Sequence, residues 1–376
     1  MTIQQLEYLL EVNRAGSITA AAKNLFVTQS SVSCAVGALE AELGIPEENR
    51  FASWQELLAQ PRMADCAFVC TMDDDHIGPA IRAMELGYHV LLEKPMSNTE
   101  AECRQIVDAA NRTGRTLAVC HVLRYTPFYM TLKNLIDQGR IGEVTTINQI
   151  ENVGYWHQAH SFVRGNWRTV RETSPMLLQK SCHDMDIILW LMGKDCRRVQ
   201  SFGSLRHFTP EHAPQGAPER CLDGCPHAQS CPYYAPRLYM DMTRTGWPVD
   251  VITTDLSEAG RRKALEEGPY GRCVYHCDND VVDRQVVNLE FEDGAVATFT
   301  MTGFSADFSR QLKIFGTRGQ IFADMGTGEI VLHPFGSEKR LVPLEEGNGS
   351  GHGGGDHGEN NRFPVILVAY GISADG

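Results

Sequence analysis

The chain has no long apolar run and no excess of positive charge. Its 376 residues include 34 lysines and arginines against 47 acidic residues, giving a net charge of −13. It has no apolar stretch of about 18 residues, the length a membrane span needs, and no basic leader with an apolar core. We therefore expect a cytoplasmic protein with no membrane partner, whose acidic surface repels phosphate backbones.

The glycine-rich turn that holds a dinucleotide is also missing from its expected place. Such a turn follows the first strand of the domain and opens a helix. The pattern G-x-G-x-x-G occurs at Gly349, Gly351 and Gly354, in a run with no helical pattern after it, so we interpret it as a loop. We expect residues 347–376 to be a glycine-rich loop with an atypical tail, and dinucleotide binding to be weakened.

Residues 64–121 alternate between short apolar runs and helical patterns. The expected elements are strands at 64–71, 88–92 and 117–121 and helices at 77–86 and 98–112. This alternation predicts a parallel sheet, which binds ligands at the carboxyl ends of its strands. Lys94 follows the second strand and so lies at that edge. With no earlier strand to cover it, strand 64–71 should be an exposed edge of the sheet.

Residues 174–193 carry titratable side chains within an apolar helical pattern. His183 and Asp186 are three residues apart and share one helical face, with Lys180 close by. A histidine beside a carboxylate on a rigid helix is suited to proton transfer near neutral pH. On burial habits alone, a core histidine is the commoner reading of such a position.

Four separated motifs resemble those of the Gfo/Idh/MocA oxidoreductases, over about residues 46–358. They are Glu93-Lys94-Pro95, Arg124-Tyr125, AHSFVRGNW at 159–167 and KSCHDMD at 180–186. The resemblance implies an α/β fold: a partial Rossmann-type parallel sheet at 46–123, then a mixed, mostly antiparallel α+β substrate and dimerisation domain at 124–346. It also implies an NAD- or NADP-dependent dehydrogenase of a sugar or cyclic polyol that assembles as a homo-oligomer.

The same resemblance assigns roles to individual residues. Lys94 would bridge nicotinamide and substrate hydroxyl, and His183 would exchange the hydroxyl proton, with Lys180 and Asp186 as catalytic neighbours. Many relatives carry an aspartate four residues before the histidine, where this chain has Gln179. The expected cofactor contacts are Thr71, His76, Glu93, Lys94 and Pro95. The expected substrate contacts are Arg124, Tyr125, Trp156, His160, Arg164, Asn166 and Trp167.

Two of these assignments have plainer alternatives. The segment from Trp156 to Trp167 could be a packed loop with polar groups on its surface. Asp73 precedes His76 near the expected cofactor path, and either Asp73 or Asp74 could simply cap the following helix.

Five of the twelve cysteines fall in a Pro- and Tyr-rich insertion at about residues 207–277. They are Cys221, Cys225, Cys231, Cys273 and Cys277. In a reducing compartment clustered thiols favour a metal over disulfides, and four thiolates suit a structural zinc ion or an iron–sulfur cluster. Their spacing matches no standard zinc finger, so ordinary partly buried thiols are the alternative.

The last part of the domain alternates with the period of β-strands. Residues 284–291 and 295–302 flank the turn Glu292-Asp293-Gly294 and predict a hairpin. Further strands are expected at 311–315, 320–323, 329–333 and 340–344. A broad sheet of this kind needs cover on its open face, which predicts contacts between subunits.

Residues 1–44 have a different pattern, which predicts three short helices and resembles the helix-turn-helix head of LysR-type regulators. The expected DNA contacts are Thr28, Gln29, Ser30, Ser31 and Ser33. The segment holds two basic residues against four acidic ones, so we expect DNA binding to be weak. A regulator fragment, or an inactive gene fusion, is the alternative to an oxidoreductase.

Overall fold

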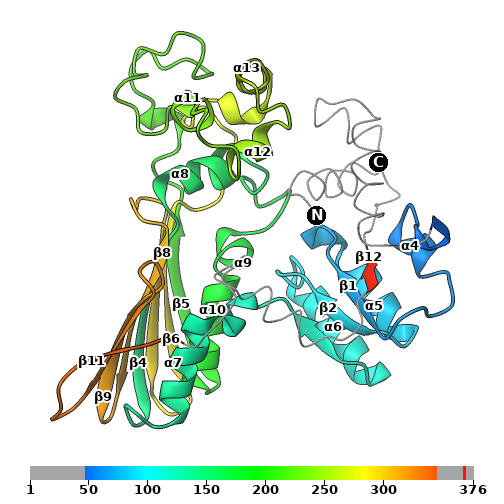
Figure 1. Ribbon diagram of the computed structural model, residues 1–376, viewed down its shortest axis with the longest axis vertical. Coiled ribbons are helices and arrows are strands. Elements are labelled where there is room, and N and C mark those ends of the chain that lie inside the picture. The colour runs from blue at the N-terminus through cyan, green and yellow to red at the C-terminus, as the bar shows by residue number, and fades with distance from the viewer. Residues whose placement is uncertain (1–46, 345–366, 370–376) are drawn as a thin grey trace.

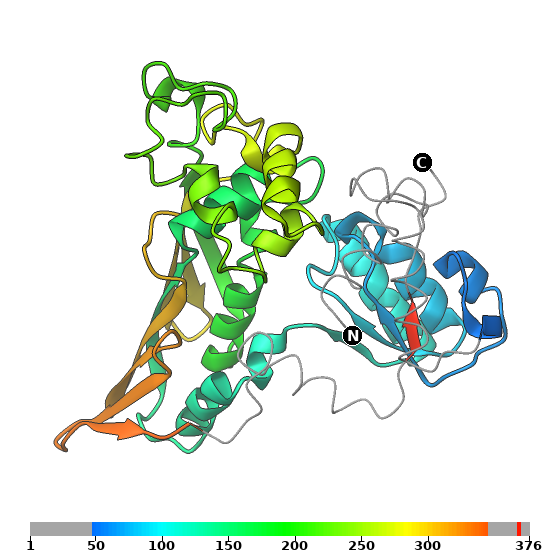
Figure 2. The ribbon, with the colours of Figure 1, turned by 45° about the horizontal axis from the view of Figure 1, so that its top comes forward.

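The computed structural model describes residues 47–344 and 367–369, which form two domains (Figure 1). The first domain is built on a small parallel sheet, and the second on a large mixed sheet with an insertion at one end. Figure 2 shows the chain crossing from the first domain into helix α7 (Pro127–Asp137) of the second. No helix in these described residues is both long and apolar enough to cross a membrane.

The first sheet has the strand order β12-β1-β2-β3, and every neighbouring pair is parallel. Its strands are β1 (Cys66–Val69), β2 (His89–Leu92), β3 (Leu117–Val119) and β12 (Leu367–Ala369). The expectation that β1 forms a free edge is wrong, because β12 pairs with it and places Leu367 opposite Ala67. Residues from the far end of the sequence therefore provide the hydrogen bonds that the edge of β1 would lack.

The helices of the first domain begin and end where their capping residues stand. The Thr99 hydroxyl accepts a hydrogen bond from the Glu102 amide at the start of α6, and Gly114, with φ of 65°, ends it. Their apolar faces pack on β1 and β2 in one core. The helical segments are η1 (Glu47–Asn49), α4 (Trp54–Leu57), η2 (Asp73–Asp75), α5 (Ile77–Glu85), α6 (Glu100–Thr113) and η3 (Val122–Tyr125).

The second sheet has eight strands in the order β11-β10-β9-β8-β4-β7-β6-β5. All neighbours are antiparallel except β4 and β7, which run parallel in the centre. Gly294, with φ of 86°, forms the β6–β7 turn, and the predicted hairpin is confirmed. The strands are β4 (Val144–Asn152), β5 (Cys196–Ser204), β6 (Arg284–Phe291), β7 (Val296–Thr302), β8 (Ser309–Gly316), β9 (Gly319–Asp324), β10 (Glu329–Pro334) and β11 (Arg340–Val342).

Helices cover one face of this sheet, and the alternation of the strands explains which face. Buried side chains such as Ile147, Ala297 and Ile314 stand opposite one another in register and pack against α7 and α10. The remaining helical segments on this side are α8 (Tyr155–His157), the π-helix η4 (Gln158–Arg164), α9 (Met176–Gln179) and α10 (Cys182–Met192). None of the helices in the described part of the chain lies on the opposite face of the sheet (Figure 1).

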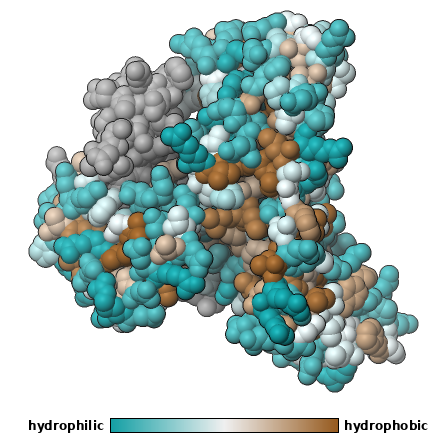
Figure 3. Space-filling view, turned by 180° about the vertical axis from the view of Figure 1, so that it is seen from behind, coloured by the Kyte–Doolittle hydropathy of each residue, from teal (hydrophilic) through white to brown (hydrophobic). Residues whose placement is uncertain are grey.

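The insertion joins the end of β5 to the start of β6 and stands above the sheet. Its helical segments are short: η5 (Pro210–His212), α11 (Ala235–Tyr239), α12 (Val249–Ile252), α13 (Glu258–Glu267) and η6 (Pro269–Gly271). Two small apolar clusters form its interior. Figure 3 shows apolar residues gathered in the middle of the molecule, whereas the insertion at the top is mostly hydrophilic.

Candidate active site

The ends of the parallel strands bring Thr71, Lys94 and His121 to one edge of the first sheet. His76 fastens this edge, because its Nδ1 lies 2.9 Å from the Pro95 carbonyl oxygen and its Nε2 lies 3.0 Å from that of Thr71. The Lys94–Pro95 peptide bond is cis. The residues predicted to contact a cofactor are thus brought together at the carboxyl edge of the sheet.

Lys94 reaches from this edge to the second domain. Its ammonium group donates a hydrogen bond of 3.1 Å to the carbonyl oxygen of Gln179, the last residue of α9. Burial lowers the pKa of His121, and the charge of Lys94 adds to that effect. The Lys94 charge therefore lies among the titratable residues at the start of α10.

The helical pattern at 174–193 is two helices in the structure, because α9 ends at Gln179 and α10 begins at Cys182. Lys180 lies in the break, 3.9 Å from the carboxylate of Glu151 on β4. His183 is buried in the first turn of α10, and its ring stands edge-on to that of His121, with centroids 6.2 Å apart. The break separates the directions in which Lys180 and His183 extend.

A cluster of four charges, of which Arg310, Asp184 and Glu151 are buried and Lys180 is half-buried, supports this break. Arg310 on β8 donates to Asp184 at 2.9 and 3.1 Å and to Glu151 at 2.7 Å. Burial raises the pKa of the Glu151 carboxyl and lowers the pKa of the Lys180 ammonium. Two cations and two anions thus balance one another away from water. Glu151 and Arg310 were not predicted as site residues from the sequence. The only indication was that each is a charged residue at a strand position that the alternating pattern predicts to be buried.

Asp186 forms an ion pair with Arg124. The Arg124 guanidinium donates to both carboxylate oxygens, at 2.7 and 2.5 Å, and His121 Nε2 lies 3.9 Å from the same group. This fork also occupies Arg124, which we expected to contact substrate. The pair therefore joins η3 to α10 beside the site.

Gln179, which stands where relatives carry an aspartate, is held by three partners. Its amide nitrogen donates to the Ser174 hydroxyl at 3.0 Å and to Asp73 at 2.5 Å, and its oxygen accepts from Trp167 Nε1 at 2.6 Å. Burial raises the pKa of the Asp73 carboxyl, while the charge of Lys94 lowers it. The N-cap position of η2 is occupied by Met72, and the Asp73 carboxyl lies close enough to Lys94 to feel its charge.

The residues predicted to bind substrate fall into two groups. Tyr125 is the last residue of η3, whereas Asn166 and Trp167 are exposed, with Trp167 37% exposed. Trp156 packs against the Trp247 ring of the insertion at 5.3 Å.

The other group faces the insertion. His160 is buried, bonded to the Tyr239 hydroxyl at 2.7 Å and stacked on Tyr270. Arg164 is buried too, and it donates to the Tyr233 and Arg272 carbonyl oxygens at 2.6 and 2.7 Å. Both side chains hold the insertion in place, so we leave them out of the proposed substrate site.

Four of the five insertion cysteines line one cavity, and Cys277 does not. Within the described ranges, no group of three or more His, Cys, Asp or Glu side chains is already arranged around a metal position. The predicted helix-turn-helix at 1–44, with its DNA-contacting residues, and the glycine pattern at 349–354 lie outside the described residues.

The strand-end edge fits the nicotinamide half of a dinucleotide. It offers the Lys94 ammonium, the Thr71 hydroxyl and backbone groups at the carboxyl ends of the parallel strands, which is the usual place for such a ligand. In residues 47–344 there is no G-x-G-x-x-G turn for the pyrophosphate. The described residues therefore fit the nicotinamide end of the cofactor, where the reaction takes place.

Comparisons with known proteins agree with this geometry. The model of the oxidoreductase family NAD-binding Rossmann fold matches residues 18–121, and that of the family's C-terminal α/β domain matches residues 133–340. The first match begins inside the segment that we compared with LysR-type regulators.

Related sequences and structures cover the chain to different extents. YteT of Bacillus subtilis is 26% identical over 308 residues, 78% of this chain and 70% of its own length. Inositol 2-dehydrogenase 2 of Saccharopolyspora erythraea is 30% identical over 133 residues, 35% of this chain and 36% of its own. Levoglucosan dehydrogenase, solved with NADH and levoglucosan, has the same fold, with a TM-score of 0.60 and 17% identity over 87% of this chain and 76% of its own. The chain belongs to the Gfo/Idh/MocA family of NAD-binding oxidoreductases.

Proposed function

We propose that this chain is an NAD- or NADP-dependent dehydrogenase of a sugar or cyclic polyol. The observation that carries the proposal is the 3.1 Å contact from Lys94, at the ligand-binding edge of the first sheet, to the backbone next to Lys180 and His183. Such an ammonium group can hold a substrate hydroxyl between the two domains. Relatives named inositol 2-dehydrogenase and levoglucosan dehydrogenase support this substrate class.

The nicotinamide end of the cofactor would rest on the strand-end edge. Thr71, His76, Glu93, Lys94 and Pro95 would hold it there, and His76 keeps the ends of β1 and β2 at a fixed separation. When bound, the cofactor accepts the hydride that leaves the substrate carbon.

The residues of the chain would handle the proton. Oxidation of an alcohol also releases a proton from its oxygen, and His183 would accept that proton. Lys94 would hold the alcohol oxygen and favour the negative charge that develops there. The ion pair of Lys180 with Glu151 would hold the segment just before His183 in place.

The substrate would lie against Tyr125, Asn166 and Trp167. Aromatic faces suit the apolar side of a sugar ring, and the amide suits its hydroxyl groups. Trp167 is held by Gln179, which in turn contacts Asp73, so the pocket wall is tied to the cofactor edge.

We also propose that the chain forms a homo-oligomer through the open face of the second sheet. Phe202 and Val286 are paired in register on that face, and Phe322 and Leu341 lie farther along it; Phe202 is 64% exposed and Leu341 is 63% exposed. A broad apolar sheet face is covered by a second copy more readily than by water.

The test is binding and turnover by the full chain. NADH and NADPH are titrated by fluorescence, and oxidation of myo-inositol, levoglucosan and hexoses is followed by absorbance. We expect one of the two cofactors to bind, one substrate of this class to be oxidised, and His183→Asn to remove turnover while cofactor still binds. Lys339→Met, at an exposed position, is the matched surface control. Folded wild-type chain that binds neither cofactor would refute the proposal.

A further inference from the structure

Four cysteines from distant parts of the insertion meet at one cavity. Cys221, Cys225 and Cys231 come from its first half, and Cys273 comes from its end, 42 or more positions later. We propose that these four side chains form a tetrathiolate site for a single zinc-class ion that holds the insertion together. The proposed dehydrogenase site uses none of these cysteines, so the metal proposal does not depend on the dehydrogenase proposal.

The backbone already brings the two halves of the site together. Cys221 donates its amide to the Gly271 carbonyl oxygen at 2.9 Å, and Cys273 donates its amide to that of Glu219 at 2.8 Å. These two bonds form an isolated antiparallel bridge between Arg220 and Arg272. Cys221 and Cys273 therefore flank one rung of paired backbone, which fixes their separation before any ion binds.

Hydrogen-bond donors point at three of the four sulfur atoms. The Ala235 amide lies 3.5 Å from Cys221 Sγ, and the Arg164 guanidinium lies 3.8 Å from the same atom. The Tyr233 amide donates to the Cys231 sulfur and the Tyr275 amide to the Cys273 sulfur, each two residues along the chain. Donors of this kind stabilise thiolates that bind a metal.

Four thiolates around a single ion give the closed tetrahedral arrangement of structural zinc sites. The ligands are not arranged around that position beforehand, so thiol rotation would accompany binding.

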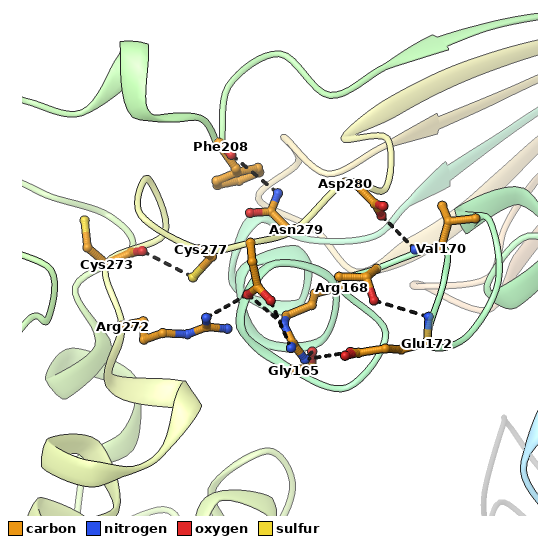
Figure 4. A network of polar contacts seen from close by, with 12 residues as sticks. Gly165, Arg168, Val170, Glu172, Phe208, Arg272, Cys273, Cys277, Asn279 and Asp280 are labelled. Atoms are coloured by element: carbon orange, nitrogen blue, oxygen red, sulfur yellow. Dashed lines mark hydrogen bonds and ion pairs between the residues drawn. The ribbon is translucent and has the colours of Figure 1, made fainter.

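Cys277 is excluded by its direction. Its Sγ donates to the Cys273 carbonyl oxygen at 3.2 Å, and Figure 4 shows the Cys273 side chain pointing away from it. The segment that carries Cys277 is anchored separately, because Asp278 accepts from Arg168 at 2.9 Å and from Arg272 at 2.7 Å. The predicted five-cysteine set is thus reduced to four.

The insertion needs a stabilising element of this kind. Its helical segments have three to ten residues, and the two apolar clusters in and beneath it hold six buried residues each, including Ala159 and Val163 of η4. Small units with little core are commonly stabilised by a metal or by disulfides, and the described cysteines, including these four, are free thiols.

The experiment measures metal in full chain purified without chelator. Elemental analysis should find about one zinc per chain, and Cys225→Ser with Cys231→Ser should lower it at least tenfold. Cys277→Ser, in the same insertion but outside the cavity, should keep the full amount. Cobalt added to metal-free wild type should give the charge-transfer and visible bands of a tetrahedral tetrathiolate site.

The wild-type chain alone also decides the matter if the double variant fails to fold. Folded wild type with neither zinc nor iron, and with no cobalt bands, would overturn the proposal. So would acid-labile sulfide with several irons per chain, which indicates a cluster, or loss of two free thiols, which indicates a disulfide.

Discussion

The Lys94 ammonium lies 3.1 Å from the carbonyl oxygen of Gln179, and this bond joins the ligand edge of the first domain to the helices of the second. Gln179 in turn contacts Asp73, next to the same edge. Gln179 therefore accepts a hydrogen bond from Lys94 through its backbone oxygen and donates one to Asp73 through its side-chain amide. The residue that differs from the aspartate of many relatives is therefore a bridge between domains.

Replacement of Lys94 by methionine should lower kcat/KM for the oxidised substrate by on the order of 10²–10⁴, because the charged group that holds the reacting oxygen is removed. Far-UV circular dichroism should be unchanged. Lys339→Met provides the comparison, and wild-type turnover by the Lys94 variant would rule out the assigned role.

Asp186→Asn should lower the pKa of His121. Burial already lowers that pKa, and the Asp186 carboxylate opposes the effect by favouring the imidazolium. Removing the negative charge leaves burial and the nearby cations unopposed. An NMR titration of the imidazole signals measures the shift, with Asp137→Asn on α7 as the control; an unchanged or higher His121 pKa would contradict the pairing.

Arg310→Met should destabilise the fold by about 3–5 kcal/mol, because it leaves Asp184 and Glu151 buried with only Lys180 to balance them. Urea unfolding measures this loss. Arg198→Met, which breaks an ion pair on the exposed strand β5, should leave the unfolding midpoint near that of wild type. Equal effects of the two changes would show that the buried cluster has no special weight.

Stability should fall as the pH drops below 6.5. Burial lowers the pKa of His157 to about 2 and that of His160 to about 3, so between these values and 6.5 only the unfolded chain binds the protons. Each histidine then removes about 1.4 kcal/mol per pH unit.

His160→Gln should reduce this slope, since glutamine can still reach the Tyr239 hydroxyl but does not titrate. Chemical unfolding at pH 7, 6 and 5 measures the difference. An unaltered slope in the variant would mean that His160 is protonated equally in both states.

Phe202→Glu combined with Phe322→Glu should separate the oligomer into monomers, because both changes put charge on the open face of the second sheet. Light scattering after size exclusion gives the mass. Glu338→Lys, in an exposed turn, changes charge without touching that face and should leave the assembly intact.

The fold could be predicted where local patterns decide structure. The strands and helices from 64 to 121 lie within a few residues of their predicted bounds, since alternation and the capping glycine at 114 determine them. The pairing of β12 with β1 could not be predicted from the sequence, because it joins residues some 300 positions apart. Nothing in three residues of strand specifies such a partner.

Only part of the candidate site could be predicted from the sequence, for a similar reason. Lys94 and His183 stand in recognisable motifs, but the partners of Asp186 and Lys180 depend on which strand lies behind α10. Arg164 looked like a sugar ligand by composition, and its partners come from the insertion. Contacts between side chains of an irregular segment produce no periodic pattern in the sequence, so they cannot be predicted from periodicity.

The parallel pairing of β4 with β7 has a consequence for how the chain reaches this structure. Asn148 stands opposite Thr298, 150 positions later, and β8 on the other side comes later still. The central strand thus leaves the ribosome long before either neighbour exists. Folding of this domain must wait for nearly the whole chain, and its rate should be limited by closure of that long loop.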